Sequence, residues 1–97
     1  MKNDKRNKIL EAAIQLAVER GYLNVSRDEI TARAGVSHGL VNYYFETVVG
    51  LWYSVMEEAI KREISSVIAD GLSAGNLVAL SAPEVLKDKA VRYLTSR

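Results

Sequence analysis

The sequence predicts an all-α fold, and two kinds of observation support this. Apolar residues recur at spacings of three and four positions along most of the chain, which is the periodicity of a helix with one buried face. Capping residues and glycines stand between these periodic segments, where helices begin and end. We expect a three-helix domain in residues 1–50, followed by a long fourth helix and a short C-terminal helical segment in residues 51–97.

Length and composition exclude several classes of protein. A chain of 97 residues forms one domain, or one domain with an appendage. It contains no cysteine, so disulfides and thiolate metal sites are excluded, and this suits the cytoplasm. We find no secretory signal, and no apolar run is long enough to span a bilayer. We therefore expect a cytoplasmic protein.

Charge gives only a local indication of a nucleic-acid partner. The net charge is +1, which by itself does not predict nucleic-acid binding. The first eight residues, however, carry four cations against one anion: Lys2, Lys5, Arg6 and Lys8 against Asp4. This segment is either a basic arm that approaches phosphates or an ordinary solvated terminus.

The first helix is predicted from about Asn3 to Arg20. Ile9, Ala13 and Leu16 fall on one side of it, and Asn3 or Asp4 can cap its start. Gly21 follows the last periodic residue and suits the left-handed conformation that ends a helix.

A second and a third short helix follow, joined by a turn that contains glycine. Ser26-Arg27-Asp28-Glu29 has the spacing of a capping box, which begins the second helix. Ala34-Gly35-Val36 ends it after about two turns, and Ser37 is the expected cap of the third helix. Two short helices that meet across such a turn form a helix-turn-helix.

The second half of the chain is expected to hold the fourth helix and the C-terminal segment. Thr47 is a plausible cap for a helix that runs to about Asp70 and ends at Gly71. Residues 72–81 are rich in small side chains and suggest a loop with one weak helical turn. Pro83 and Glu84 then suit the start of a last helix.

The third helix has one face that can pack and one that can read DNA. Val41, Tyr44 and Phe45 should point to the core, and the opposite side carries His38, Gly39, Asn42 and Tyr43. Gly39 leaves room for close approach of backbone to DNA. Asn42 can bond an adenine edge at two points.

Several side chains around this face allow more than one reading. His38 can donate to guanine or to phosphate, and Tyr43 can reach phosphate or a thymine methyl. Ser26 and Arg27 stand where free amides of the second helix attract phosphate. Alone, each residue has a plainer reading: Ser26 as a cap, Arg27 as a solvated side chain, and Tyr43 as a half-buried aromatic.

The first half of the chain resembles the tetracycline-repressor (TetR) family. The resemblance is carried by four segments in order, with Leu51 following: Ile9–Leu16, Glu19–Tyr22, Ile30–Ser37 and His38–Phe45. The third segment is similar to the family motif IA-x-x-AGVS, and the fourth to its recognition helix. Taken with the observations above, the resemblance implies DNA contacts from Lys5, Arg6, Ser26, Arg27, Ser37, His38, Gly39, Leu40, Asn42, Tyr43 and Tyr44.

The chain departs from the family pattern at two positions and in length. The family commonly has tyrosine where this chain has Asn42, and a phosphate-binding lysine where it has Val48. Family members also add a helical ligand-binding domain, whereas only 26 residues follow Gly71 here. We expect no drug-sized internal pocket, and therefore no small-molecule effector.

Surplus apolar surface in the second half predicts a homodimer. A stripe of Leu51, Val55 and Ala59 suits packing on the first domain. Further apolar residues need cover and are the expected dimer contacts: Trp52, Met56, Ile60 and Ile64 with Leu86, Ala90, Tyr93 and Leu94. In the alternative reading, these two sets cover each other within a monomer.

Together these features predict a sequence-specific transcriptional regulator. We expect a small dimeric repressor that occludes a promoter at a palindromic operator, without cofactor or metal. The alternative is a helical protein-interaction module that has lost DNA binding. An enzyme is not expected, because His38 is the only histidine and no acid-base partner accompanies it in a recognisable motif.

Overall fold

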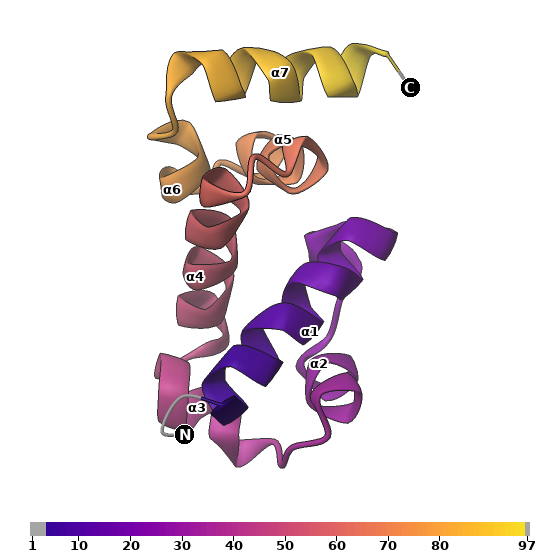
Figure 1. Cartoon of the computed structure of the whole chain (residues 1–97), viewed down its shortest axis with the longest axis vertical. Coiled ribbons are helices and arrows are strands. Elements are labelled where there is room, and N and C mark those ends of the chain that lie inside the picture. Colours follow the sequence, from indigo (N-terminus) through magenta and orange to yellow (C-terminus); the bar gives the residue numbers. More distant parts are fainter. Residues whose placement is uncertain (1–3, 97) are drawn as a thin grey trace.

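A computed structural model describes residues 4–96, and every regular element in that range is a helix (Figure 1). The all-α prediction is therefore confirmed. The elements are α1 (Asp4–Arg20), the short 3-10 helix η1 (Tyr22–Asn24), α2 (Arg27–Ala34), α3 (Gly39–Phe45), α4 (Val48–Lys61), α5 (Ser65–Ala74), α6 (Leu77–Leu80) and α7 (Glu84–Thr95). The predicted cap Asn3 and the arm residue Lys2 lie outside the described range.

The helices are arranged along an axis of 38 Å, with the other two extents near 21 Å. Figure 1 shows α2 and α3 at one end of this axis and α5, α6 and α7 at the other. Helices α1 and α4 extend between the two ends. The predicted DNA-reading helix α3 thus lies at the end of the molecule opposite the C-terminal helix α7 (Figure 1).

One continuous core joins the two halves of the chain. Ile9 and Leu16 of α1 are buried against Ile30 of α2 and Val41 of α3. From α4, the predicted packing stripe of Leu51, Val55 and Ala59 is buried in the same cluster. Because α4 shares its core with α1 and α3, the helix-turn-helix is held rigidly against the segment that follows it.

Two predicted helix starts are confirmed and one is wrong. Ser26 and Glu29 form both bonds of the capping box of α2, and the Thr47 hydroxyl accepts from the Gly50 N–H at the start of α4. Ser37 does not cap α3. The helix begins at Gly39, and the residue before it, His38, has helical backbone angles and no side-chain cap bond.

The fourth helix is shorter than predicted, because it breaks after Lys61. The Glu63 N–H donates to the Ile60 carbonyl and the Ile64 N–H to the Ala59 carbonyl, which is the Schellman pattern of a helix end. This pattern places Glu63 in the left-handed region, at φ 56°. Glycine is the usual residue there, and its absence is why the sequence did not reveal the break.

Gly71 does not end a helix, as had been predicted, but lies buried inside α5. A Cβ at this position would come within 2.5 Å of the Met56 Cε and 2.7 Å of the Ala79 Cβ. The glycine is therefore required by the close approach of α5 to α4 and α6. Gly75, at φ 75°, ends α5 instead. The predicted weak turn in residues 72–81 is α6, which Asn76 caps.

Candidate nucleic-acid interface

A tight turn sets the angle between α2 and α3. Gly35 adopts φ 71°, and its N–H donates to the Ala32 carbonyl while the Val36 N–H donates to the Thr31 carbonyl. On the core side of α3, Val41 is fully buried and Phe45 nearly so. Because α2 and α3, on either side of this turn, both pack on the core, the fold fixes the orientation of α3.

The other side of α3 is open to solvent. His38, Asn42 and Tyr43 are exposed, and 76% of Tyr43 is accessible. Gly39 is exposed, and nothing lies within 4 Å of the place where a Cβ would be. The structure thus brings the four residues predicted to read DNA onto one free surface.

Tyr44 and Leu40 are half-buried at the margin of that surface. The rings of Tyr43 and Tyr44 meet edge to face, with centroids 4.8 Å apart and an interplanar angle of 88°. This contact limits the positions that the exposed Tyr43 ring can take.

His38 has a close neighbour that the sequence did not indicate. Its Nδ1 lies 3.3 Å from the Asp28 Oδ1, although both side chains are more than half exposed. The two residues are ten positions apart and come from different sides of the turn, so no spacing rule would have paired them.

The start of α2 presents Ser26 and Arg27. The Ser26 hydroxyl accepts from the Glu29 N–H and donates to the Glu29 carboxylate, so its first role is structural. Arg27 is exposed and has no ion-pair partner within residues 4–96. Its guanidinium is therefore available to an anion, as the prediction requires.

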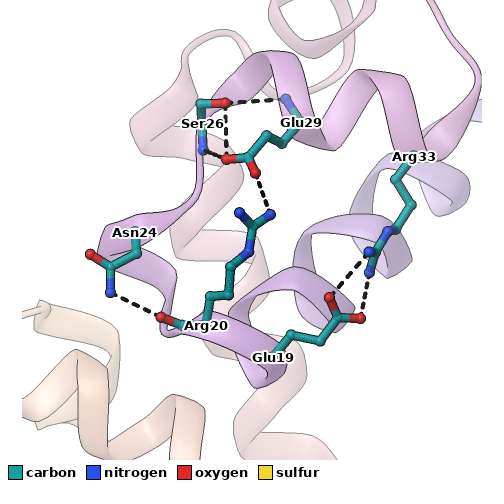
Figure 2. Close-up of polar contacts among 6 residues, drawn as sticks. All are labelled: Glu19, Arg20, Asn24, Ser26, Glu29 and Arg33. Carbon is teal, nitrogen blue, oxygen red and sulfur yellow. Dashed lines mark hydrogen bonds and ion pairs between the residues drawn. The ribbon is translucent and has the colours of Figure 1, made fainter.

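Two ion pairs fasten α2 to the end of α1 (Figure 2). Arg33 donates two bonds to the Glu19 carboxylate, at 2.6 and 3.1 Å, and Arg20 pairs with Glu29. The pKa of Glu29 is lowered by the backbone bond from Ser26 and then by Arg20, and that of Glu19 by Arg33. These carboxylates remain charged, which keeps α2 in place against the end of α1.

The N-terminal cations are partly built into α1. Lys5 is exposed in the first turn, and the guanidinium of Arg6 lies 4.7 Å from the centre of the Phe45 ring. A cation over an aromatic face is attracted by the ring quadrupole. This contact places a positive charge beside the end of α3.

The predicted dimer residues divide into covered and uncovered ones. Met56 (1% exposed), Leu86 (8%) and Ala90 (0%) are buried within the single chain, so they offer no surface to a second copy in this conformation. Trp52 is half-buried, with its ring 5.2 Å from that of Tyr22. Ile60, Ile64 and Leu94 are half-buried, and 38% of Tyr93 is exposed. Other exposed apolar side chains lie on α6 and α7: Leu77, Leu80, Val85 and Val91.

A solvent-open cleft of about 360 Å³ lies where the end of α1 meets α5 and α7. Its lining is largely polar and includes Arg20, Asn24, Ser66, Asp70 and Tyr93. Asp70 is already engaged, because its carboxylate accepts from the Tyr22 N–H at 3.3 Å. The volume is at the lower end of the range of small-molecule sites.

Two further features are absent from residues 4–96. No group of three or more histidine, aspartate or glutamate side chains is arranged to hold a metal ion. No helix in that range has the length and apolar character needed to cross a membrane.

A family model matches the part of the chain that holds this surface. Residues 9–47 match the model of bacterial regulatory proteins of the tetR family, which covers most of α1 together with α2 and α3. No solved structure matches the chain.

Curated relatives match over a similar region. The chain is 32% identical over 66 residues to the HTH-type transcriptional activator FasR of Mycolicibacterium smegmatis, a match of 68% of this chain and 30% of FasR. It is 34% identical over 59 residues to uncharacterised HTH-type transcriptional regulators of Mycobacterium tuberculosis and Mycobacterium bovis. In each case the match spans less than a third of the relative's length.

Proposed function

Because residues 9–47 form a helix-turn-helix domain of the bacterial tetR family, we propose that this protein is a sequence-specific DNA-binding regulator of transcription. The observation that carries the proposal is the division of α3 into two sides. Val41 and Phe45 fix the helix in the core, while Asn42 and Tyr43 stand free on the outer side. A helix held in this way can enter the major groove without rearrangement of the domain.

The surrounding charges support binding to the DNA backbone. Arg27 is unpaired within the described residues, and Lys5 and Arg6 lie on the first turn of α1. Phosphate contacts from such cations position a protein on the duplex, while base contacts specify the sequence. The roles of Ser26, Ser37, Leu40 and Tyr44 in this grip follow the same reasoning and are part of the proposal.

The mode of action that we propose is a homodimer that occludes a promoter. One helix-turn-helix makes few base contacts, and two-fold pairing doubles them on a palindromic site. Helices α4 to α7 form the end of the molecule opposite α3, where a second copy would leave the reading surface free (Figure 1). A regulator of this kind acts on cytoplasmic DNA, without a cofactor and without catalysis.

A binding selection tests the function directly. The protein is incubated with fragments of its own genome at a stated salt concentration, and the bound fragments are sequenced and then measured by mobility shift. We expect a shared palindromic motif. A reporter gene behind that motif then gives the sign of regulation, which matters because FasR is named an activator.

The second candidate is a helical interaction module without DNA binding. It is favoured by Val48, half-buried at the start of α4, because the family commonly has a phosphate-binding lysine at this position. Absence of any enriched motif, with the protein folded, would support this candidate. The expectation that no small molecule acts as effector stays a prediction, since the relatives extend well beyond the matched region.

A further inference from the structure

Asp28 of α2 contacts His38, the residue before α3, at 3.3 Å between Oδ1 and Nδ1. We propose that Asp28 is a positioning residue that keeps the hydrogen of neutral His38 on Nδ1, so that Nε2 presents a lone pair to DNA. His38 would then select a base that presents an amino group in the major groove, cytosine or adenine. The base assignment rests on the proposed function.

The His38 imidazole is not used to cap α3, so it is available to contact Asp28. His38 precedes α3 in the capping position, but its side chain makes no cap bond, and its backbone angles are φ −57° and ψ −37°. The ring instead lies toward α2, on the other side of the turn. Within residues 4–96, the Asp28 carboxylate is the one polar side chain that the imidazole contacts.

The chemistry of the contact fixes the position of the hydrogen. An ionised carboxylate has only acceptor lone pairs, and Asp28 lies in the first turn of α2. The carboxylate charge lies 3.3 Å from Nδ1 through Oδ1, so it attracts a hydrogen on Nδ1 and repels a lone pair there. The arrangement is attractive only when Nδ1 carries the hydrogen.

The consequence falls on the far nitrogen of the ring. In neutral imidazole one nitrogen donates and the other accepts, so a hydrogen on Nδ1 leaves Nε2 as an acceptor. In the major groove the amino donors are N4 of cytosine and N6 of adenine, whereas guanine and phosphate offer acceptors. This changes the earlier expectation that His38 donates to guanine or phosphate.

The tautomer can be measured without DNA, because the chain contains a single histidine. A long-range proton–nitrogen correlation spectrum of the full chain is recorded at about pH 8, where a free imidazole is neutral. We expect the Nδ1–H form in the parent and a shift toward the Nε2–H form in Asp28→Ala. Asp88→Ala removes another exposed acid, from α7, and should leave the spectrum of the ring unchanged.

Base preference is measured by selection from double-stranded oligonucleotides randomised across the site. We expect one position at which the parent prefers cytosine or adenine over guanine by about fivefold to tenfold. Asp28→Ala should lose or reverse that preference, and Asp88→Ala should keep it.

The possible failures are distinguishable. An Nε2–H tautomer in a parent protein that selects DNA would overturn this inference and leave the proposed function intact. An Nδ1–H tautomer in a folded protein that selects no DNA would overturn the base assignment together with the proposed function. Identical base preferences in the parent and Asp28→Ala would show that Asp28 does not act through His38.

Discussion

At the scale of single residues, the outer side of α3 carries side chains that the core does not use. Asn42 and Gly39 make no contact that the fold needs: the first is exposed, and the second has open space around its Cα. Substitutions here should change DNA binding and leave folding intact. This separation makes the surface unusually easy to test.

Replacing Asn42 with alanine should relax the base preference at one operator position. A bidentate contact between an amide and adenine contributes about 1–3 kcal/mol of discrimination, and alanine removes both bonds. The measurement is a binding titration against all four bases at each position. Gln15→Ala, an exposed amide on α1, is the matched control. Equal preferences in the parent and Asn42→Ala at every position would show that another side of α3 reads the DNA.

Replacing Gly39 with alanine should move stability and affinity in opposite directions. The added methyl meets nothing in the free protein and favours the helix by up to about 1 kcal/mol. Against DNA it occupies space needed for close approach, at a steric cost of about 1–3 kcal/mol. Thermal unfolding and a mobility-shift titration of the same preparation check the two effects. Undiminished affinity would mean that the backbone at Gly39 does not approach the duplex.

At the scale of elements, the bend between α4 and α5 combines a strained backbone conformation with ion pairs between side chains. The bend between α4 and α5 depends on Glu63 in a left-handed conformation, which costs a residue with a side chain about 1–2 kcal/mol. Beside it, Arg62 donates to the Glu11 carboxylate on α1 and to Glu58 one turn earlier on α4. The bend thus has a strained backbone at Glu63 and is stabilised by the ion pairs of Arg62.

Glu63→Gly should stabilise the protein by about 0.5–1 kcal/mol. Glycine removes the left-handed strain but restores some chain entropy to the unfolded state, so the net gain is smaller than the strain itself. The exposed pair with Lys89, at 3.5 Å, contributes little. Chemical denaturation measures the difference, with Glu63→Ala as the control that loses the charge but keeps the strain. Equal stability of the two variants would contradict this account of the bend.

The Arg62 bridge should make stability depend on pH in the acid range. The bonds from Arg62 lower the pKa of Glu11 in the folded protein below the usual value of about 4.3. The bridge therefore stabilises fully above that value, and its contribution is lost as pH falls through the lowered folded pKa. Because both side chains are largely exposed, it amounts to less than about 1 kcal/mol at neutral pH.

We expect the unfolding free energy of Arg62→Met to fall less steeply between about pH 5 and pH 3 than that of the parent. Lys61→Met removes an exposed neighbouring cation and should keep the parent slope. Denaturant titrations across the range give the slopes. Parallel curves for Arg62→Met and the parent would show that the bridge does not form in solution.

At the scale of the whole molecule, the two proposed interfaces lie at opposite ends of a 38 Å body. The reading surface of α3 is at one end, and the apolar residues of α6 and α7 are at the other (Figure 1). Since one core connects the ends, an assembly at the C-terminal end would set the spacing of the reading helices. Two such helices must stand about one DNA turn apart on a palindrome.

We expect the protein to sediment as a dimer at micromolar concentration. The physical reason is the apolar surface that remains uncovered on the C-terminal elements, with Leu77 69% and Val85 61% exposed. Leu77→Lys with Val85→Lys should shift the protein toward monomer, while Val18→Lys on α1 tests an exposed apolar position elsewhere, which is 51% exposed. A monomeric mass for the parent, without tight binding to a palindromic site, would overturn both the dimer and the occlusion mechanism.

The sequence by itself determined what local signals can carry. The capping box at Ser26, the Thr47 cap and the helical spacing of the apolar residues predicted α1, α2 and the start of α4. The same spacing separated Val41 and Phe45 from the outer side of α3. These features depend on residues a few positions apart, so they can be predicted without a structure.

Only the tertiary structure decided the features that depend on distant residues. The bend at Glu63 and the buried place of Gly71 follow from the packing of α5 on α4 and α6, against the local preferences of both residues. Met56 and Leu86 have the pattern of interface residues and prove to be core. The contact of His38 with Asp28 also exists only once the turn is folded. In each case the residue that decides the conformation or burial is distant in the sequence and is brought near by packing of the core. No periodicity in the sequence predicts such a contact.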